Sequence, residues 1–246
     1  PKPSEGKRSG GAVFAAGVDL ALARARVAGC SAPYGRGGAA VLEGGTCVAD
    51  DVGFFGNVAD EGGALSLCPS YDDSAAGAAT FVATNATFSG NGAVHGGAAF
   101  LDDGTSLMLN GSVVDGNVAL YSGGAFYLTD AALSLRETSA ARNGRGVEGG
   151  FAYVEAFGAI DGGGTTSVAA SAADAGAGVY AFDFSTVSVA GVGFSDGAAL
   201  HGGVLYCAVG ATCALSRVVS RRNEALLCGA LAYADRSGRP RGTGPR

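Results

Sequence analysis

Short segments of alternating apolar and small or polar residues follow one another along the chain, separated by Gly, Asn and Asp. In one unit the apolar segments are 98–101, 107–109 and 113–114, with turns at 102–104 and 110–111. A period of two residues is typical of β-strands, because successive side chains point to opposite faces. No segment combines helical spacing of apolar residues with capping residues, which excludes leucine-rich and helical repeats. Each unit therefore predicts three short strands joined by tight turns.

A Gly-Gly-Ala signature marks the start of each unit. Its clearest copies begin at Gly10, Gly37, Gly62, Gly96 and Gly123. Weaker copies begin at Gly149, Gly176, Gly202 and Gly229. Successive first glycines are 27, 25, 34, 27, 26, 27, 26 and 27 residues apart, so one unit departs from a period near 26. This regularity is typical of a solenoid, and it predicts a single repeat domain over residues 10–235.

Two columns of like residues appear when the units are aligned on their first glycine. The fourth following position holds Phe14, Val41, Ser66, Phe100, Tyr127, Tyr153, Tyr180, Tyr206 and Tyr233. The fifth holds Ala15, Leu42, Leu67, Leu101, Leu128, Val154, Ala181, Cys207 and Ala234. Columns in register predict strands stacked into a parallel β-helix. Because adjacent residues face opposite ways, we expect the aliphatic column inside and the aromatic column on the outer face.

A second motif, F-x-x-N, lies near the end of the units. Its first place holds Phe54, Phe88, Val114 and Phe194. Its last place holds Asn57, Asn91, Asn117, Asn143 and Asn223, and Gly197 replaces Asn once. Asn tolerates the left-handed backbone of a tight corner, and stacked amides can hydrogen-bond from coil to coil. We therefore expect these asparagines to be structural.

The F-x-x-N and Gly-Gly-Ala motifs recur together along the chain, as in residues 88–91 followed by 96–98. This paired arrangement resembles the repeats of the chlamydial polymorphic outer-membrane proteins. The resemblance extends over residues 10–234, although the late repeats lose the second Gly or the Asn. It implies an all-β, right-handed parallel β-helix of the pectin-lyase type. With the repeat count, that means about eight coils with a period near 26 residues. It also implies exposure at a cell surface and a role in adhesion.

Composition and charge narrow the function classes. Glycine supplies 44 of the 246 residues, Trp is absent and Met occurs once, which suits thin stacked layers. Residues 10–234 carry 9 basic and 20 acidic side chains, a net charge of −11, so we expect no nucleic-acid partner. No apolar run of about 18 residues predicts a membrane-spanning segment, and no signal peptide is recognisable. The basic ends, 1–9 and 236–246, are predicted to be disordered linkers to flanking domains of a larger protein.

Six cysteines and two N-x-S/T sequons, at Asn85 and Asn110, favour an oxidising, extracellular compartment. Cys207 and Cys213 flank a five-residue turn, a spacing that predicts a local disulfide. Cys47 and Cys68 occupy similar offsets in neighbouring coils and form a second candidate pair. Metal binding is the rival interpretation, but the chain has no CxxC motif and its two histidines are remote in sequence, so we expect no metal site.

Paired acids at 50–51, 72–73 and 102–103, together with His95 and His201, invite comparison with glycosidases that use clustered Asp and a His. An Asp-Asp dipeptide does not place both carboxylates on one surface, because neighbouring strand residues face opposite ways. Both histidines directly precede a Gly pair. Elsewhere this position holds Arg36, Glu61, Ser122, Glu148, Ala175 and Cys228, which indicates a tolerant solvent position. We therefore expect no catalytic residue. The glycines do not form a nucleotide-binding loop, and no cofactor is expected.

Two features are candidate binding sites. Sugars stack on exposed aromatic faces, so the column Tyr127, Tyr153, Tyr180, Tyr206 and Tyr233 is a candidate glycan platform, with plain structural stacking as the alternative. The 34-residue coil carries extra material around residues 69–77, and insertions in repeat proteins map to loops that often bind partners. Tyr71, Asp72 and Asp73 are the candidates there.

The repeat pattern and its candidate residues support two functions. The leading hypothesis is a non-catalytic extracellular or cell-surface segment that acts in adhesion, as a spacer or in glycan binding. The alternative is a polysaccharide lyase or glycoside hydrolase of the same fold. Several carboxylates converging with one another or with Arg would favour the enzyme, and scattered acids would favour the adhesive rod.

Overall fold

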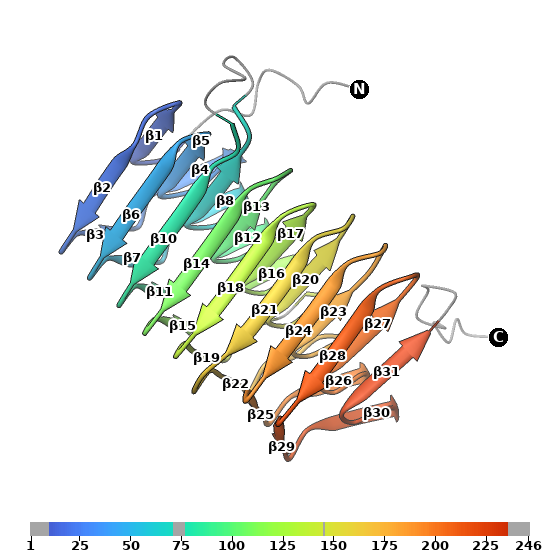
Figure 1. The fold of residues 1–246 in the computed structure, drawn as a ribbon. Helices are drawn as coiled ribbons and strands as arrows, with labels where there is room; N and C mark the ends of the chain where they lie inside the picture. Colours follow the sequence, from blue (N-terminus) through green and yellow to red (C-terminus); the bar gives the residue numbers. More distant parts are fainter. Residues whose placement is uncertain (1–9, 71–76, 145, 236–246) are drawn as a thin grey trace.

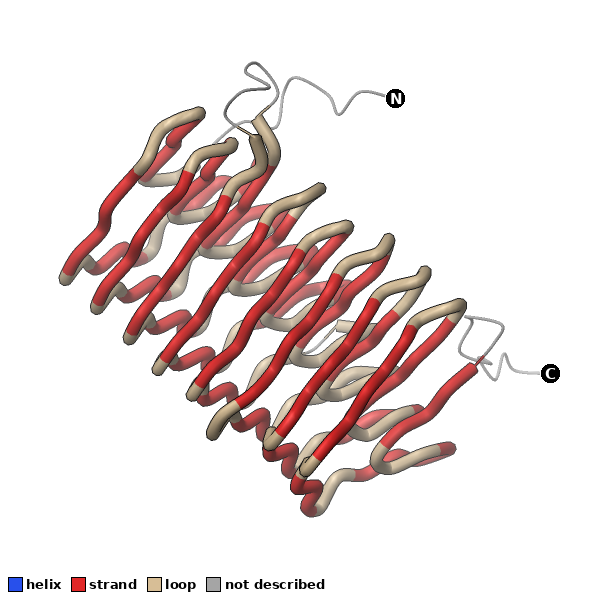
Figure 2. The backbone as a smooth tube through the Cα atoms, in the orientation of Figure 1, coloured by secondary structure: helices blue, strands red, loops and turns tan. Residues whose placement is uncertain are grey.

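The computed structural model describes residues 10–70, 77–144 and 146–235. They form a rod of stacked coils that begins with β1 and ends with β31 (Figures 1 and 2). All the named strand pairs are parallel, and the described part of the chain contains no helix. The prediction of an all-β parallel β-helix of about eight coils is confirmed. The predicted linkers, 1–9 and 236–246, lie outside the described residues.

Sheet A is built from the strand that follows each Gly pair, and it runs the length of the rod. Its strands are β1 (Val13–Ala16), β5 (Ala40–Glu43), β9 (Leu65–Cys68), β13 (Ala99–Leu101), β17 (Phe126–Thr129), β20 (Ala152–Glu155), β23 (Val179–Ala181), β27 (Leu205–Ala208) and β31 (Ala232–Asp235). Leu101 pairs with Leu67 on one side and with Leu128 on the other. Alignment on the first glycines therefore gives the observed register.

Sheets B and C contain the second and third strands of each coil, which follow the sheet A strand along the chain. Sheet B contains β2 (Leu20–Ala23), β6 (Thr46–Asp50), β10 (Thr80–Thr84), β14 (Ser106–Asn110), β18 (Ala132–Arg136), β21 (Ala159–Gly163), β24 (Thr186–Ala190) and β28 (Thr212–Ser216). Sheet C contains β3 (Arg26–Ala28), β7 (Gly53–Phe55), β11 (Thr87–Ser89), β15 (Val113–Asp115), β19 (Ser139–Ala141), β22 (Ser167–Ala169), β25 (Gly193–Ser195) and β29 (Val219–Arg221). These are the three strands per coil that the alternation predicts.

A fourth strand, not predicted, precedes the Gly pair in most coils. These strands form sheet D in two parts: β4 (Ser31–Arg36), β8 (Val58–Glu61), β12 (Gly92–His95) and β16 (Val118–Ser122), then β26 (Ala198–His201) and β30 (Glu224–Cys228). Isolated parallel bridges, such as Ser122 to Glu148, continue the pairing between the two parts. The register of sheet D shifts within strand pairs, which explains why its sequence lacks a clean two-residue alternation.

The Gly pair forms the corner between sheets D and A. Gly96 has a φ of 65°, in the left-handed region that disfavours other residues. A Cβ on Gly97 would lie 2.3 Å from the carbonyl oxygen of Gly124 in the next coil. The first glycine is therefore required by backbone conformation and the second by the close approach of neighbouring coils.

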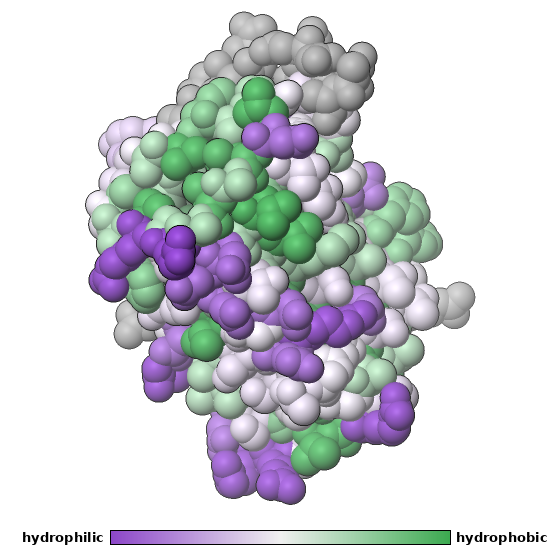
Figure 3. Space-filling model, turned by 60° about the vertical axis from the view of Figure 1, so that its left-hand side comes forward, coloured by the Kyte–Doolittle hydropathy of each residue, from purple (hydrophilic) through white to green (hydrophobic). Residues whose placement is uncertain are grey.

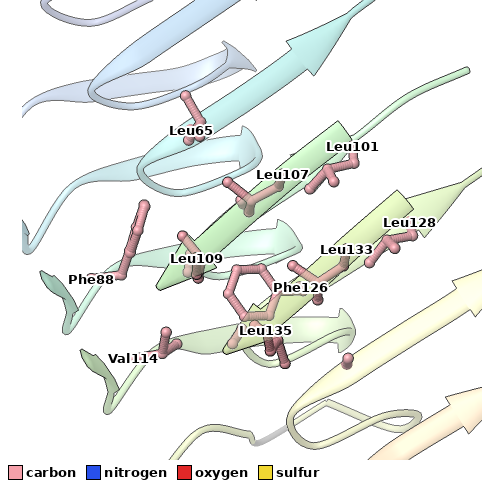
Figure 4. Close-up of a cluster of buried hydrophobic side chains, with 14 of the residues drawn as sticks. Leu65, Phe88, Leu101, Leu107, Leu109, Val114, Phe126, Leu128, Leu133 and Leu135 are labelled. Atoms are coloured by element: carbon pink, nitrogen blue, oxygen red, sulfur yellow. The ribbon is translucent and has the colours of Figure 1, made fainter. Parts of the chain in front are cut away.

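The inner faces of sheets A, B and C enclose one continuous hydrophobic core (Figure 4). The predicted aliphatic column lies inside it, with Leu42, Leu67, Leu101 and Leu128 buried. Phe54 and Phe88 of the F-x-x-N motif stack in this core with ring centroids 5.0 Å apart. Full burial of such a side chain stabilises a fold by about 1.5–3 kcal/mol, so this core is the main stabilising element.

The asparagines form a buried ladder, as predicted. The side-chain amide of Asn91 donates to Oδ1 of Asn117 at 2.9 Å, and that of Asn117 donates to Oδ1 of Asn143 at 3.0 Å. Each amide also donates to a backbone carbonyl of the preceding coil. Of the two reasons expected for Asn, the hydrogen bonds from coil to coil are confirmed and the left-handed backbone was wrong. The left-handed residue at this corner is the preceding one, for example Gly116, and Asn is needed because its amide satisfies buried polar groups.

The long coil accommodates its extra residues at the turn between β9 and β10. Pro69 and Ala78 form an antiparallel bridge, and the Ser70 backbone N–H donates to the Gly77 carbonyl at 2.9 Å. Pro69, Ser70, Gly77 and Ala78 thus pair with one another and belong to none of the named strands. Tyr71, Asp72 and Asp73 lie outside the described residues.

Both end coils expose apolar side chains. At the first coil, Phe14 and Val18 are exposed, and Figure 3, which brings this end of the rod forward, shows apolar side chains among hydrophilic ones. At the last coil, Leu226, Leu227 and Leu231 are exposed. Val41, the strand partner of Phe14 in the next coil, is buried by stacking, which the first coil lacks on one side. Sheet D exposes apolar side chains in interior coils too, for example Leu120 and Tyr121.

Candidate functional site

The aromatic column forms a ladder of stacked rings on the outer face of sheet A. Tyr127, Tyr153, Tyr180 and Tyr206 pair residue by residue in adjacent strands. Their successive ring centroids are 4.9, 5.3 and 4.7 Å apart, and the interplanar angles are 19°, 9° and 10°. Tyr233 extends the ladder with a tilt of 41°. The predicted column therefore exists, and it lies on the predicted face.

The column is buried, which favours structural stacking over the candidate glycan platform. Tyr153, Tyr180 and Tyr206 are 7%, 1% and 0% exposed, and Tyr127 and Tyr233 are partly buried against the same cluster. Tyr153, Tyr180 and Tyr206 each lie between two neighbouring rings, so a sugar has no free ring face to stack on there. An outer sheet face need not be exposed, because another segment of the same coil can cover it.

The covering segment is the end of sheet D. Side chains directly before the Gly pairs pack against the column: the His95 ring lies 5.1 Å from Tyr127, and the His201 ring lies 5.3 Å from Tyr233. Ala175 occupies the same position and is fully buried in this cluster. The interpretation of this position as a tolerant solvent site was wrong, with exposed Cys228 as the exception. The two glycines turn the chain so sharply that the preceding residue faces the column.

Arg36 is the centre of a charged network over the first rings. Its guanidinium contacts Glu61 at 2.6 Å and Asp102 at 2.8 Å, and its Nη1 donates to Cys68 Sγ at 3.0 Å. It also lies 5.4 Å from the centre of the Phe100 ring. Burial by itself lowers the pKa of Arg36, but the surrounding acidic groups raise it overall, so the guanidinium stays charged. Burial raises the pKa of the Cys68 thiol.

A second network joins carboxylates to the middle of the column. Tyr127 and Tyr153 both donate their hydroxyls to Glu155, the latter at 3.0 Å. Burial, and then Glu155, raises the pKa of both phenols, so they remain protonated donors. Burial and the nearby charge of Glu155 also raise the pKa of Glu148. Glu148 and Glu155 thus lie near each other beside the buried phenols, and a pair of carboxyl groups in different surroundings is an arrangement that can donate and accept a proton.

The cysteines divide into one bridge and four free thiols among the described residues. Cys207 and Cys213 form a disulfide with a Cα–Cα distance of 6.7 Å, as predicted. The second candidate pair was wrong, because Cys47 and Cys68 are free. Cys47 lies in the inner core, whereas Cys68 contacts Arg36 on the outer face, so the wall of the β-helix separates them.

Both sequon asparagines lie at the corner between sheets B and C of adjacent coils. Asn85 and Asn110 are exposed, and the Asn85 backbone N–H donates to the Asn110 carbonyl at 2.9 Å. Their side chains are therefore accessible on one edge of the rod.

Residues 10–70, 77–144 and 146–235 contain neither a metal-binding cluster nor a membrane-spanning helix. No group of three or more His, Cys, Asp or Glu side chains there has a geometry that could hold a metal ion. None of the described segments is a helix of sufficient length and apolarity to cross a membrane.

No protein family model matches this chain, and no curated protein or solved structure matches it either. The structure by itself establishes the coarser conclusion, a parallel β-helix.

Sequence reasoning missed one aromatic feature. Phe157 and Phe184 stack with ring centroids 5.8 Å apart and are 70% and 56% exposed. They lie in turns where other coils place Gly44–Gly45 or Gly210. The sequence does contain a signal, because Phe stands at a turn position where other coils have Gly. The two aligned columns did not reveal it, because they contain strand positions only.

Proposed function

We propose that this chain is an extracellular or cell-surface β-helix segment of a larger protein, acting in adhesion, as a spacer or in glycan binding. The observation that carries the proposal is the Cys207–Cys213 pair, which is within bridging distance across one turn. Disulfides form and persist in oxidising environments and are rare in the reducing cytosol.

Three other observations support the proposal. Both sequon asparagines are exposed on one edge, where attached glycans would not disturb the core. The continuous sheets provide a stiff scaffold, which suits a spacer. The apolar end coils are suited to stacking against further repeats or flanking domains.

Carboxylates converge on sheet A as the enzyme alternative requires, but their bonds to one another and to buried side chains are equally compatible with a non-catalytic role. Glu61 and Asp102 neutralise Arg36, and Glu155 accepts from two tyrosines, so these groups satisfy one another over the buried column. Such saturated networks stabilise a structure in which polar groups are half-buried.

The experiment is to secrete residues 1–246 from eukaryotic cells and coat the product on beads. We expect peptide mass spectrometry without reduction to find the Cys207–Cys213 bridge and glycans on Asn85 or Asn110. We expect the coated beads to adhere to cell surfaces or extracellular polysaccharide. A secreted product with free thiols at Cys207 and Cys213 and no glycan on either sequon, together with inert beads, would contradict the proposal.

Cleavage of a polysaccharide by hydrolysis or β-elimination is a second candidate function, because two carboxylates converge in this structure. Glu148 and Glu155 lie together at Tyr127, with one carboxyl prone to protonation and the other held by two phenols. The test is release of reducing or unsaturated ends from a polysaccharide panel. Glu148→Gln should abolish any such activity, and Glu137→Gln, a change at a distant exposed acid, should retain it. Absence of turnover by the unaltered protein would reject this candidate.

A further inference from the structure

The turns that join sheet A to sheet B carry a second, exposed aromatic stack. Phe157 follows β20, and Phe184 follows β23 in the next coil. Their rings are nearly parallel, with an interplanar angle of 15°. Among the described residues, Phe157 stacks on Phe184 only, so its other face is open.

These phenylalanines occupy an unfavourable backbone conformation. Ala156 and Phe157 have φ values of 51° and 67°, and Asp183 and Phe184 have values of 48° and 59°. Two consecutive left-handed residues define a turn that prefers Gly at its second position, which is where Gly45 and Gly210 lie in other coils. A bulky side chain in this region costs about 1–2 kcal/mol. Because the rings are exposed, little burial offsets this cost, and such strain is a reason to look for function.

The turn of the next coil supports the pair. A Cβ on Gly210 would lie 2.6 Å from Cδ1 of Phe184, so the ring rests directly on this glycine. The Cys207–Cys213 disulfide joins the strands on either side of the same turn. Backbone hydrogen bonds link the turns, from Phe157 N–H to the Asp183 carbonyl and from Phe184 N–H to the Val209 carbonyl. The stack is therefore held in place without a ligand.

The preceding coil leaves the open face of Phe157 accessible. The turn between β17 and β18 contains only residues 130–131, whereas the turn after β20 contains 156–158. Asp130 in this shorter turn is exposed, and Asp161 on sheet B is exposed and paired with Arg136. An open ring face thus lies on an edge that also offers acceptors and donors.

We propose that Phe157 and Phe184, with Asp130 beside them, form a binding site for a neutral glycan. The apolar C–H face of a pyranose ring stacks on the free face of Phe157, continuing the stack, and the Asp130 carboxylate accepts from sugar hydroxyls. The surrounding acids and the net charge of −11 in residues 10–234 disfavour uronates and sulfated chains. This inference rests on the proposed adhesive role and assigns its ligand class.

The test is depletion of the secreted protein by insoluble or gel-immobilised neutral polysaccharides, namely cellulose, chitin, mannan and β-1,3-glucan, with pectate and alginate as acidic counterparts. We expect Phe157→Ala to weaken binding about tenfold or more. Phe157→Gly removes the ring and suits the left-handed backbone, so it separates lost binding from lost folding. Tyr34→Ala is the matched control, since Tyr34 is 89% exposed on β4.

The outcomes separate the site from the function. Binding to none of the neutral polysaccharides, stronger binding to the acidic ones, or unchanged binding by both Phe157 variants overturns the site. Adhesion of coated beads that is insensitive to Phe157→Gly overturns the site and leaves the adhesive role standing. Phe157-dependent glycan binding without bead adhesion supports the site and overturns the adhesive role.

Discussion

Two aromatic stacks run along the same rod with nearly the same geometry. Tyr153 and Tyr180 lie 5.3 Å apart at 9°, and Phe157 and Phe184 lie 5.8 Å apart at 15°. The tyrosines are buried under the end of sheet D, whereas the phenylalanines project from turns that no described segment covers. The coil spacing of a parallel β-helix thus produces stacked rings wherever two coils repeat an aromatic residue. Stacking by itself does not distinguish a core from a binding surface, but coverage does.

The largest expected difference between the stacks is in stability. Tyr180→Ala should lower the free energy of unfolding by about 3–5 kcal/mol, because it empties a fully buried ring site. Phe184→Ala should lower it by less than about 1 kcal/mol. Guanidinium unfolding followed by circular dichroism measures both. Similar losses in the two variants would show that the stacks are equally structural.

Removing one hydroxyl sharpens the contrast further. Tyr153→Phe keeps the buried ring but removes a donor to Glu155, and it should cost about 1–2 kcal/mol. Tyr34→Phe, at an exposed ring, should leave the free energy of unfolding unchanged. Equal stability of the Tyr153 variant and the unaltered protein would mean that the hydroxyl contributes nothing to the fold.

The buried stack should also make stability depend on pH through Glu148. Burial and Glu155 raise the pKa of Glu148 above its ordinary value of 4.5 in the folded state. Its contribution to stability is therefore present below that value and is lost as pH rises through the raised folded pKa. Glu148→Gln should raise the thermal midpoint relative to the unaltered protein at pH 7 and leave it unchanged near pH 3. The change in the free energy of unfolding at pH 7 should be smaller than the change caused by Tyr153→Phe. A constant difference across this range would rule out this titration.

The smallest effect is expected at the exposed stack. Phe157→Gly should leave the free energy of unfolding unchanged or raise it by up to about 1 kcal/mol, because glycine adopts a φ of 67° without strain. Phe126→Ala, at a buried position of the preceding coil, serves as the destabilising reference. A loss of several kcal/mol in the Phe157 variant would show that this ring is part of the core.

Much of the fold was predictable because each repeat position recurs in register. The aliphatic column, the Asn ladder and the place of the insertion each follow from aligning the units on one glycine. The local disulfide followed from the spacing of Cys207 and Cys213 around one turn. The prediction of a Cys47–Cys68 bridge was wrong, because similar positions in neighbouring repeats do not reveal which face a side chain lies on. Cys47 lies in the core and Cys68 on the outer face.

The candidate sites were harder to predict, because their surroundings come from different parts of a coil. The sequence alone determined the all-β repeat, its register and the face on which Tyr153 and Tyr180 lie, since strand alternation is a local property. Only the tertiary structure decided that sheet D covers this face while Phe157 stays open, because coverage depends on how the Gly pair folds one strand over another.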